Sequence, residues 1–431
     1  MSTLTTTVAA LAPQAESYVE LLHSGPHWLF ELTLEVLSAP LGFAAGRLWR
    51  TGVLRHVHRD LHAMHGADLA ASAGRCPDLP TAGASLFMPD RRATALATAP
   101  SAPARPMPPL PVSLFSIPFG LAGLAGTWLY AAQVHLVPRA AGTVLVLTSA
   151  AVWLLLMAGR ARRRRTASAD LLDPTAGPFT ALMLLTPLLV TVQGLATVAP
   201  QVAQLLFDVL TGLVVALAGW LTGHWMSVPL DLDRLHPGYL LPSVAGGYVA
   251  SAGAAGLGQR SLAQVMFGLA SVSWLVLGPL VRGRLMFRPV LPPALRPTLA
   301  IEAAPPALAT LAWLSLNGGR LDAVTFGLCG YGLLMALAQF RLLLVYRRLP
   351  FSPGFWAFTF PAAALTTAAL HWLALDAPPG RDLWSYLLIG TLTLLISGVG
   401  IRTVLALRRG ELLTPTKTAR VDGAPEHARA A

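Results

Sequence analysis

Charged side chains are scarce in this sequence. Only 12% of its 431 residues are charged, against about 25% in an ordinary soluble domain, whereas 54% are hydrophobic and the mean hydropathy is +0.59. The chain is too apolar for a soluble domain. The composition therefore predicts an all-α integral membrane protein.

Cysteine is almost absent as well. Cys76 and Cys329 lie in unlike contexts and show no metal-binding or redox spacing, which argues against a disulfide framework and against CxxC chemistry. Ionisable residues inside the apolar stretches are scattered and do not converge in pairs, so a membrane-embedded enzyme is disfavoured. The sequence predicts no cofactor and no enzymatic activity.

The net charge of +11 and the pI of about 10.7 could suggest nucleic acid as a partner. The arginines, however, lie in short loops between apolar stretches and not on one face of a polar domain, so we expect no nucleic acid. Short cytoplasmic loops of membrane proteins are rich in arginine. The arginines therefore indicate topology.

Ten apolar spans follow residue 110, each near the roughly 20 residues that a bilayer requires. The second, fourth, sixth and eighth loops between them hold most of the loop arginines, and each of the other loops holds at most one. This bias predicts a multi-pass protein of the plasma (bacterial-type inner) membrane with five helical hairpins and both termini in the cytoplasm. The expected spans are 111–131, 141–160, 178–198, 201–225, 238–257, 261–283, 297–317, 322–345, 354–374 and 383–407.

Interior prolines occur in the odd-numbered spans, whereas the even-numbered spans hold only Pro279, near the end of its span. A proline inside a helix removes one hydrogen bond and bends the axis, and a membrane tolerates it where neighbouring helices shelter the freed carbonyl. The pattern predicts five kinked helices around a central pore. The alternative is that these helices are only closely packed, since membrane helices in general pack through small residues. The prolines of this set are Pro118, Pro187, Pro242, Pro305, Pro306 and Pro361.

The first hundred residues differ from the rest, and we expect three regions. Residues 1–105 form an N-terminal region, partly disordered and cytoplasmic or at the membrane surface; residues 106–410 form the membrane domain; residues 411–431 form a disordered cytoplasmic tail. His58, His62 and His65 fall at helical spacing and are a weak metal-site candidate. We expect no metal, because a solvated or headgroup-facing helix explains them better.

Four segments resemble, in order, the signatures of the tellurite-resistance and dicarboxylate transporter family. These are LPVSLFSIPFGLAGLAGTW, HPGYLLPSVAGGYVASAGA, PTLAIEAAPPA and FWAFTFP. The family includes bacterial TehA, fungal malate permease, sulfite exporters and plant slow anion channels, and the resemblance covers about residues 108–410. It implies ten helices in five hairpins, a central conduit and assembly as homotrimers.

The resemblance also implies a gate. The family's gating phenylalanine is the second aromatic residue of the F-x-F-P pattern, which is Phe360 here, and Phe358 is expected to be a packing residue. An aromatic ring across a narrow apolar pore blocks hydrated ions. If the inner helices begin at the cytoplasmic side, their N-terminal partial positive charges would concentrate anions at that mouth. Small inorganic or organic anions are therefore the expected substrates.

Two ionisable residues inside the spans leave alternatives open. Glu302 is a candidate for proton or ion coupling, a partner for a nearby arginine such as Arg296, or an interfacial residue; His371 is a second coupling candidate or an interfacial residue. A gated anion channel or uniporter is the main prediction. A proton-coupled carrier of C4-dicarboxylates such as malate, a tellurite-resistance or sulfite-efflux permease, and a sensor that uses the N-terminal histidines remain alternatives.

Overall fold

The computed structural model describes residues 110–162 and 167–409. Every regular element in these residues is helical, and nine helices among them are long and apolar enough to cross a membrane. The expectation of an all-α membrane protein is confirmed. The N-terminal region with His58, His62 and His65, and the tail 411–431, lie outside the described residues.

Five helices are long, uninterrupted and largely covered with exposed apolar side chains. They have 24 to 28 residues each, which at about 1.5 Å per residue is sufficient to cross a bilayer. Leu155, Leu337 and Leu394 are typical of their outward faces. We call them the outer helices: α5 (Arg139–Arg162), α8 (Pro200–Ser227), α10 (Arg260–Phe287), α12 (Ala323–Tyr346) and α14 (Arg381–Arg408).

Five other segments alternate with the outer helices and begin with a tighter or wider turn before the α-helix. We call them the inner segments. In four of them a 3₁₀ helix leads directly into the α-helix: Val112–Phe115 before α4 (Ser116–Gln133), Gly177–Ala181 before α7 (Leu182–Gln193), Arg296–Ala303 before α11 (Ala304–Leu316) and Pro353–Phe358 before α13 (Thr359–Asp376).

The remaining inner segment differs from the expected uniform span 238–257. It consists of the 3₁₀ helix Pro237–Leu240, a π-helical stretch Leu241–Ala245 and the short helix α9 (Gly246–Gly256). Because its α-helix has only 11 residues, this segment is not among the nine helices that are long enough to cross a membrane. Three short elements lie between the long ones: α6 (Ala167–Leu172) and the 3₁₀ helices Leu195–Thr197 and Leu232–Arg234.

Most of the prolines lie where the inner segments become α-helical. Pro118 and Pro361 are each the third residue of their α-helix, Pro305 and Pro306 follow the first residue of α11, and Pro242 lies in the π-helical stretch. The first turn of a helix has no intrahelical partner for its N–H groups, so a proline costs little there. Pro187 alone in this set lies well inside an α-helix, α7.

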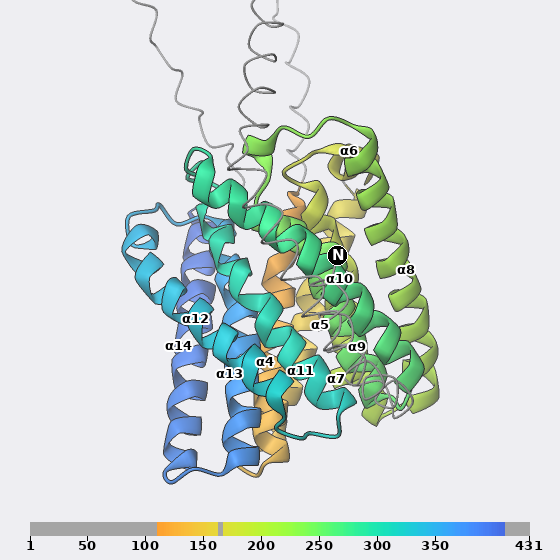
Figure 1. The fold of residues 1–431 in the computed structure, drawn as a ribbon, viewed down its shortest axis with the longest axis vertical. Coiled ribbons are helices and arrows are strands. Elements are labelled where there is room, and N and C mark those ends of the chain that lie inside the picture. Colours follow the sequence, from red (N-terminus) through yellow and green to blue (C-terminus); the bar gives the residue numbers. More distant parts are fainter. Residues whose placement is uncertain (1–109, 163–166, 410–431) are drawn as a thin grey trace, which may run out of the picture. The chain divides into compact units, whose positions relative to one another are not determined.

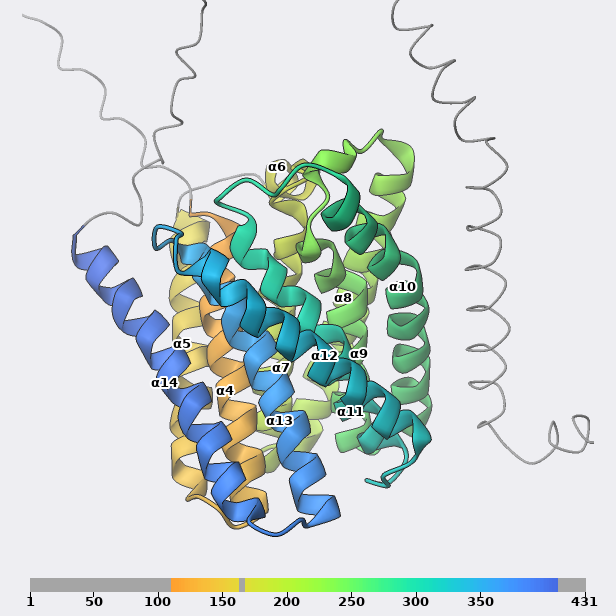
Figure 2. The same ribbon diagram turned by 60° about the vertical axis from the view of Figure 1, so that its left-hand side comes forward.

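The inner segments contact one another in a closed cycle (Figures 1 and 2). The contacts run from α4 to α7, α7 to α9, α9 to α11, α11 to α13 and α13 back to α4. Each inner helix also contacts the outer helix that follows it in the chain. The prolines of the odd-numbered spans therefore lie in the inner segments, and the long apolar helices lie around these segments.

Candidate functional site

Two cavities lie within the cycle of inner segments. The first, of about 420 Å³, is lined by residues that include Tyr130, Gln193, Thr367 and His371, and we call it the His371 chamber. The second, of about 600 Å³, includes Asp170 and is called the Asp170 chamber. Phe360 is the one residue of the described ranges that lines both.

The Phe360 side chain is buried and held against α4. Its ring stacks on Phe119 with the centroids 3.8 Å apart and the planes 23° from parallel. Gly123 faces the same ring, because a Cβ atom at that position would be 2.9 Å from Phe360 Cδ2. A side chain at residue 123 would therefore push against the ring. Stacked aromatic pairs of this kind contribute about 0.5–1.5 kcal/mol beyond their burial.

Phe358, two residues earlier, lines neither chamber. Its ring meets the Tyr346 ring edge-on at 4.5 Å and the Phe355 ring at 5.5 Å, so it packs toward the neighbouring segment α12. The two phenylalanines of the F-x-F-P pattern therefore occupy different surroundings.

The contact between α4 and α13, which we call the α4–α13 seam, extends to both sides of the stacked pair. Gly120 lies so close to Thr359 that no side chain fits between them, and the hydroxyls of Thr127 and Thr367 are 2.8 Å apart. Close backbone approach at glycine and hydroxyl contacts between helices are common means of packing in membranes. The backbone that carries Phe360 is thus fixed to α4 on both sides of the ring.

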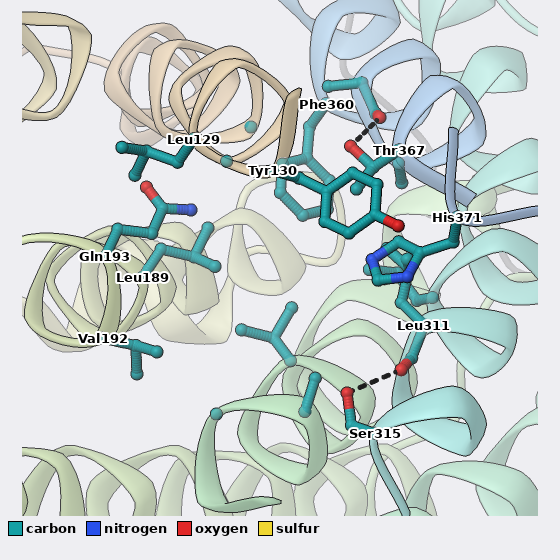
Figure 3. A pocket seen from close by; sticks show the side chains of 18 of the residues that line it. Leu129, Tyr130, Leu189, Val192, Gln193, Leu311, Ser315, Phe360, Thr367 and His371 are labelled. Carbon is teal, nitrogen blue, oxygen red and sulfur yellow. Dashed lines mark hydrogen bonds between the residues drawn. The ribbon is translucent and has the colours of Figure 1, made fainter. Parts of the chain in front are cut away.

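The His371 chamber has polar groups on several walls (Figure 3). The imidazole of His371 stacks on the Tyr130 ring, with centroids 3.6 Å apart and an interplanar angle of 19°. Gln193 lies on the other side of the chamber in this view, and its Nε2 donates to the Ala122 carbonyl at 3.1 Å. Arg139, at the start of α5, is the charged residue of the lining.

The Asp170 chamber lies where the inner segments begin. Its lining includes the residues that precede four of them, Pro111, Ala176, Leu295 and Ser352, and none of these four caps its helix with a side chain. Helix N-termini carry partial positive charge and free N–H groups. The structure thus gathers four such ends at one chamber. The residue that precedes the fifth inner segment, His236, does not line this chamber.

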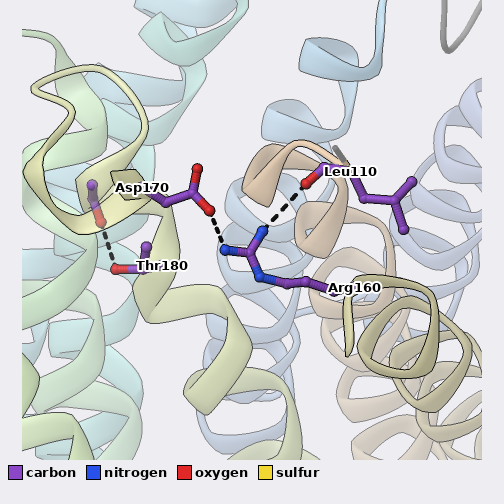
Figure 4. A network of polar contacts seen from close by, with 5 residues as sticks. Leu110, Arg160, Asp170 and Thr180 are labelled. Atoms are coloured by element: carbon purple, nitrogen blue, oxygen red, sulfur yellow. Dashed lines mark hydrogen bonds and ion pairs between the residues drawn. The ribbon is translucent and has the colours of Figure 1, made fainter. Parts of the chain in front are cut away.

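Carboxylates oppose this positive field in the Asp170 chamber. Asp170 is buried and pairs with the buried Arg160 guanidinium, which also donates to the Leu110 carbonyl at 3.3 Å (Figure 4). Asp173 accepts from the backbone N–H groups of Thr175 at 2.7 Å and Ala176 at 2.9 Å. These two aspartates were not predicted as site residues, because they follow a run of arginines in a segment between two apolar spans.

Glu302 lies outside both chambers. It is buried in the 3₁₀ start of its segment, and its Oε2 is 3.3 Å from Nε of Arg282 on α10. Arg282 also lies over the Tyr331 ring, 5.3 Å from its centroid. Glu302 therefore has an arginine partner, as one of the alternatives predicted, but the partner is Arg282 and not the suggested Arg296, whose Nε donates to the Leu291 carbonyl. Glu302 therefore connects an inner segment with an outer helix.

His236 is a buried residue that the sequence analysis did not single out. Its Nδ1 accepts from Gly238 N–H at 3.1 Å, which caps the following 3₁₀ helix, and its ring stacks near Phe179 with centroids 5.5 Å apart. Burial lowers the pKa of His236 from 6.5 to about 4. The imidazole is therefore neutral at physiological pH and acts as a structural cap.

A metal centre has no counterpart in the part of the chain that the structure describes. No group of three His, Cys, Asp or Glu side chains lies close enough to hold an ion within residues 110–162 and 167–409. The histidines of the weak metal candidate are outside these ranges, so that candidate is untested.

The part of the chain that forms this bundle is similar to a known family. The sequence profile of a family described as voltage-dependent anion channels matches residues 109–404. The chain is also similar to the tellurite resistance protein TehA homolog of Haemophilus influenzae, with 28% identity over 295 residues, which cover 66% of this chain and 89% of that protein. The family match begins beyond the first hundred residues, as the sequence motifs do.

Proposed function

The chain belongs to the voltage-dependent anion channel family, and we propose that it passes small anions across a membrane through a route that Phe360 closes. The resemblance to tellurite-resistance and dicarboxylate transporters is confirmed by this membership. Together with the apolar helices, it identifies a multi-pass membrane protein from a family of channels and transporters, not of enzymes.

The observation that carries the proposal is the position of Phe360 between the two chambers. One ring forms part of both walls, and it is buried against Phe119. A bulky apolar group in a narrow passage excludes hydrated ions by occupying the lumen and by disfavouring water. Rotation of this side chain would join the chambers without moving the backbone, which the α4–α13 seam holds in place.

The architecture we propose is a ten-helix bundle of five hairpins in which the inner segments surround the route. The cycle of contacts among α4, α7, α9, α11 and α13 supports it. In this architecture Pro187 would bend α7 within its length, and the other prolines would mark the point where a 3₁₀ or π-helical start changes to the α-helix or precedes it. The proposed kink residues are Pro118, Pro187, Pro242, Pro305, Pro306 and Pro361.

Orientation follows from the arginines. They are concentrated in the loops at the Asp170 chamber's end of the bundle, so we place this end and both termini in the cytoplasm, in the plasma membrane. The uncapped helix starts and these arginines would raise the local anion concentration, while Asp170 and Asp173 moderate it. The homotrimer that the resemblance implies is part of the same proposal.

A current measurement on the full chain in planar bilayers tests the gate. Phe360→Ala is expected to raise anion current about tenfold or more at equal protein content, because it removes the ring from the passage. Phe358→Ala is the matched control, since its ring lines neither chamber, and it should leave the current unchanged. Equal currents for Phe360→Ala and the unaltered protein would contradict the proposal.

A second candidate is a proton-coupled carrier of C4-dicarboxylates, and the place of His371 in a chamber wall favours it. Tellurite and sulfite are further candidate cargoes, the first suggested by the name of the Haemophilus relative. Uptake of labelled malate into proteoliposomes with and without an inward proton gradient separates the mechanisms. Uptake by a coupled carrier requires the proton gradient, and His371→Phe should abolish this gradient-driven uptake. Flux through a channel does not respond to the proton gradient. Glu302→Gln tests the other coupling residue.

A further inference from the structure

The last outer helix, α14, is tied by hydrogen bonds to the two inner segments that form the α4–α13 seam. The indole N–H of Trp128, on α4, donates to Thr393 Oγ1 at 3.1 Å. The indole N–H of Trp356, in the 3₁₀ start that leads into α13, donates to Thr403 Oγ1 at 2.8 Å. Both threonines are on α14, so one helix is bound to both sides of the seam.

The indole of Trp356 lies between three segments. Its Nε1 faces α14, and its benzene ring faces α4, because a Cβ atom at Gly120 would be 3.2 Å from Trp356 Cε3. The side chain is buried, and it lines the Asp170 chamber together with Phe360, four residues further along the chain. The Trp356 indole therefore sets the separation of α4, α14 and the start of α13 in a wall of this chamber.

Apolar packing surrounds these hydrogen bonds. α14 contacts both α4 and α13 along its length (Figure 2), although only 22% of its most apolar window is buried, so the buried part is one narrow face. The core cluster at this face joins residues of all three helices: Leu124 of α4, Ala363 of α13, and Leu392, Ile396 and Val399 of α14. The inward face of α14 is thus devoted to the two helices of the seam.

The two threonine hydroxyls are oriented by their own helix. Thr403 donates to the Val399 carbonyl at 2.8 Å, and Thr393 donates to the Ile389 carbonyl at 2.7 Å. Each hydroxyl has thereby used its one hydrogen, and its oxygen is available as an acceptor for the indole. An indole N–H is a donor only, so a shift of α14 away from the seam would leave the buried Trp356 N–H without a partner, which is costly.

The separation of α4 and α13 matters for the Phe360 ring. This ring stacks on Phe119 and faces Gly123, and both of these residues are on α4. The attraction between packed atoms falls steeply with distance, and a gap of about 0.5–1 Å removes a quarter to a half of it. Any contact that keeps α4 and α13 together therefore favours the stacked position of the ring.

We propose that Trp356 and Thr403 are positioning residues of the gate, and that α14 is a brace that holds Phe360 in its closed position. The bond between Trp128 and Thr393 completes the brace on the α4 side. This inference rests on the proposed function, because it concerns the same ring and the same passage. It extends that function to an outer helix, none of whose residues lines either chamber.

Single-channel recording of the full chain in planar bilayers tests the brace. Thr403→Val replaces the hydroxyl with a methyl group of similar size, so the Trp356 N–H loses its acceptor. The open fraction should then rise about twofold to tenfold at unchanged conductance. Thr403→Ser keeps the acceptor and should retain the open fraction of the unaltered protein. Trp356→Phe, which removes the donor and keeps an aromatic ring, should raise the open fraction in the same way.

Thr148→Val on α5 is the matched control. The Thr148 hydroxyl is exposed and donates to the Val144 carbonyl of its own helix, so the same change of side chain breaks no contact between helices there. It should leave the open fraction unaltered. An equal rise in Thr148→Val or in Thr403→Ser would overturn the proposal, because the effect would then not depend on the bond between indole and hydroxyl.

A double variant shows whether the brace acts through the stacked rings. Phe119→Leu removes the partner of the Phe360 ring, so loosening the α4–α13 seam has less left to disturb. The open fraction of Phe119→Leu combined with Thr403→Val should therefore rise by less than the product of the two separate increases. A rise equal to that product would show that α14 acts on another part of the passage, and the brace would be wrong.

The outcomes also separate the brace from the gate. If Phe360→Ala carries no more current than the unaltered protein, the gate proposal fails, and the brace fails with it. If Phe360→Ala raises the current but Thr403→Val and Trp356→Phe keep the open fraction of the unaltered protein, the brace is wrong and the gate stands.

Discussion

Inner segments and outer helices have similar hydropathy but opposite relations to the rest of the molecule. Among the nine spans, 44% to 78% of residues are buried in the most apolar window of the inner ones, against 6% to 33% in the outer ones. The mean hydropathy of those windows differs little, 1.3 to 1.8 against 1.7 to 2.1. Hydropathy therefore identifies which segments enter a membrane, and the prolines, together with the 3₁₀ or π-helical starts, distinguish the segments that pack inside the bundle.

To test this comparison, the same larger side chain is introduced at one glycine of an inner segment and at one glycine of an outer helix. A Cβ atom at Gly247 of α9 would lie 2.7 Å from the Ala270 Cβ atom, whereas nothing lies within 4 Å of one at Gly268 of α10. Gly247→Val is expected to lower the free energy of unfolding by about 1–3 kcal/mol through overpacking, and Gly268→Val by far less. Thermal unfolding in detergent measures both, and similar losses would contradict the division into inner and outer helices.

His236, which precedes the fifth inner segment, is buried and neutral. Its pKa is lower in the folded state, about 4, than the ordinary 6.5, so the unfolded chain binds the extra proton first on acidification. The contribution of His236 is fully present above about pH 6.5 and is lost as the pH falls toward 4. From pH 7 to pH 5 the loss is about 2 kcal/mol.

His236→Asn separates this titration from other acid effects. Asparagine retains an acceptor for the Gly238 N–H but has no proton to gain in this range. Its stability should therefore fall less steeply between pH 7 and pH 5 than that of the unaltered protein, whatever the difference at pH 7. Parallel pH profiles would show that His236 is not the titrating cap.

Much of the fold could be predicted because it depends on local composition. The outer helices follow the expected spans to within a few residues at most ends: α8 runs from 200 to 227 against an expected 201–225. The 3₁₀ and π-helical starts of the inner segments were missed, because an apolar run does not distinguish one helical hydrogen-bond pattern from another. They depend on the neighbouring segments packed against them.

The site was less predictable, because its contacts join residues far apart in the chain. Phe360 came from a family motif, but nothing local indicates that it stacks on Phe119. Glu302 was noticed as an intramembrane acid, yet its partner is Arg282, 20 residues earlier and on an outer helix, and not the nearer Arg296. Sequence distance favoured the wrong arginine.

The Glu302–Arg282 pair gives a prediction about charge in the two regions. Glu302→Gln should lower the free energy of unfolding by about 1–2 kcal/mol, less than for a fully buried pair because the Arg282 side chain is 36% exposed. Asp382→Asn removes the acid of an exposed pair on α14 and should change it by less than about 0.5 kcal/mol. Denaturation in detergent compares them, and a larger loss for Asp382→Asn would contradict the contrast.

The smallest predicted effect concerns the ring that holds Phe360. Phe119→Leu keeps an apolar side chain on α4 but removes the stacked partner, and because such a stack contributes about 0.5–1.5 kcal/mol, the open fraction of the gate should rise about twofold to tenfold. Single-channel recording in planar bilayers measures that fraction at unchanged conductance. Phe340→Leu, on the exposed face of α12, is the matched change in an outer helix and should leave it unaltered. If both variants open equally often, the closed position of Phe360 depends on the general packing of the bundle and not on Phe119; if neither changes while Phe360→Ala conducts, the ring is held by the α4–α13 seam alone.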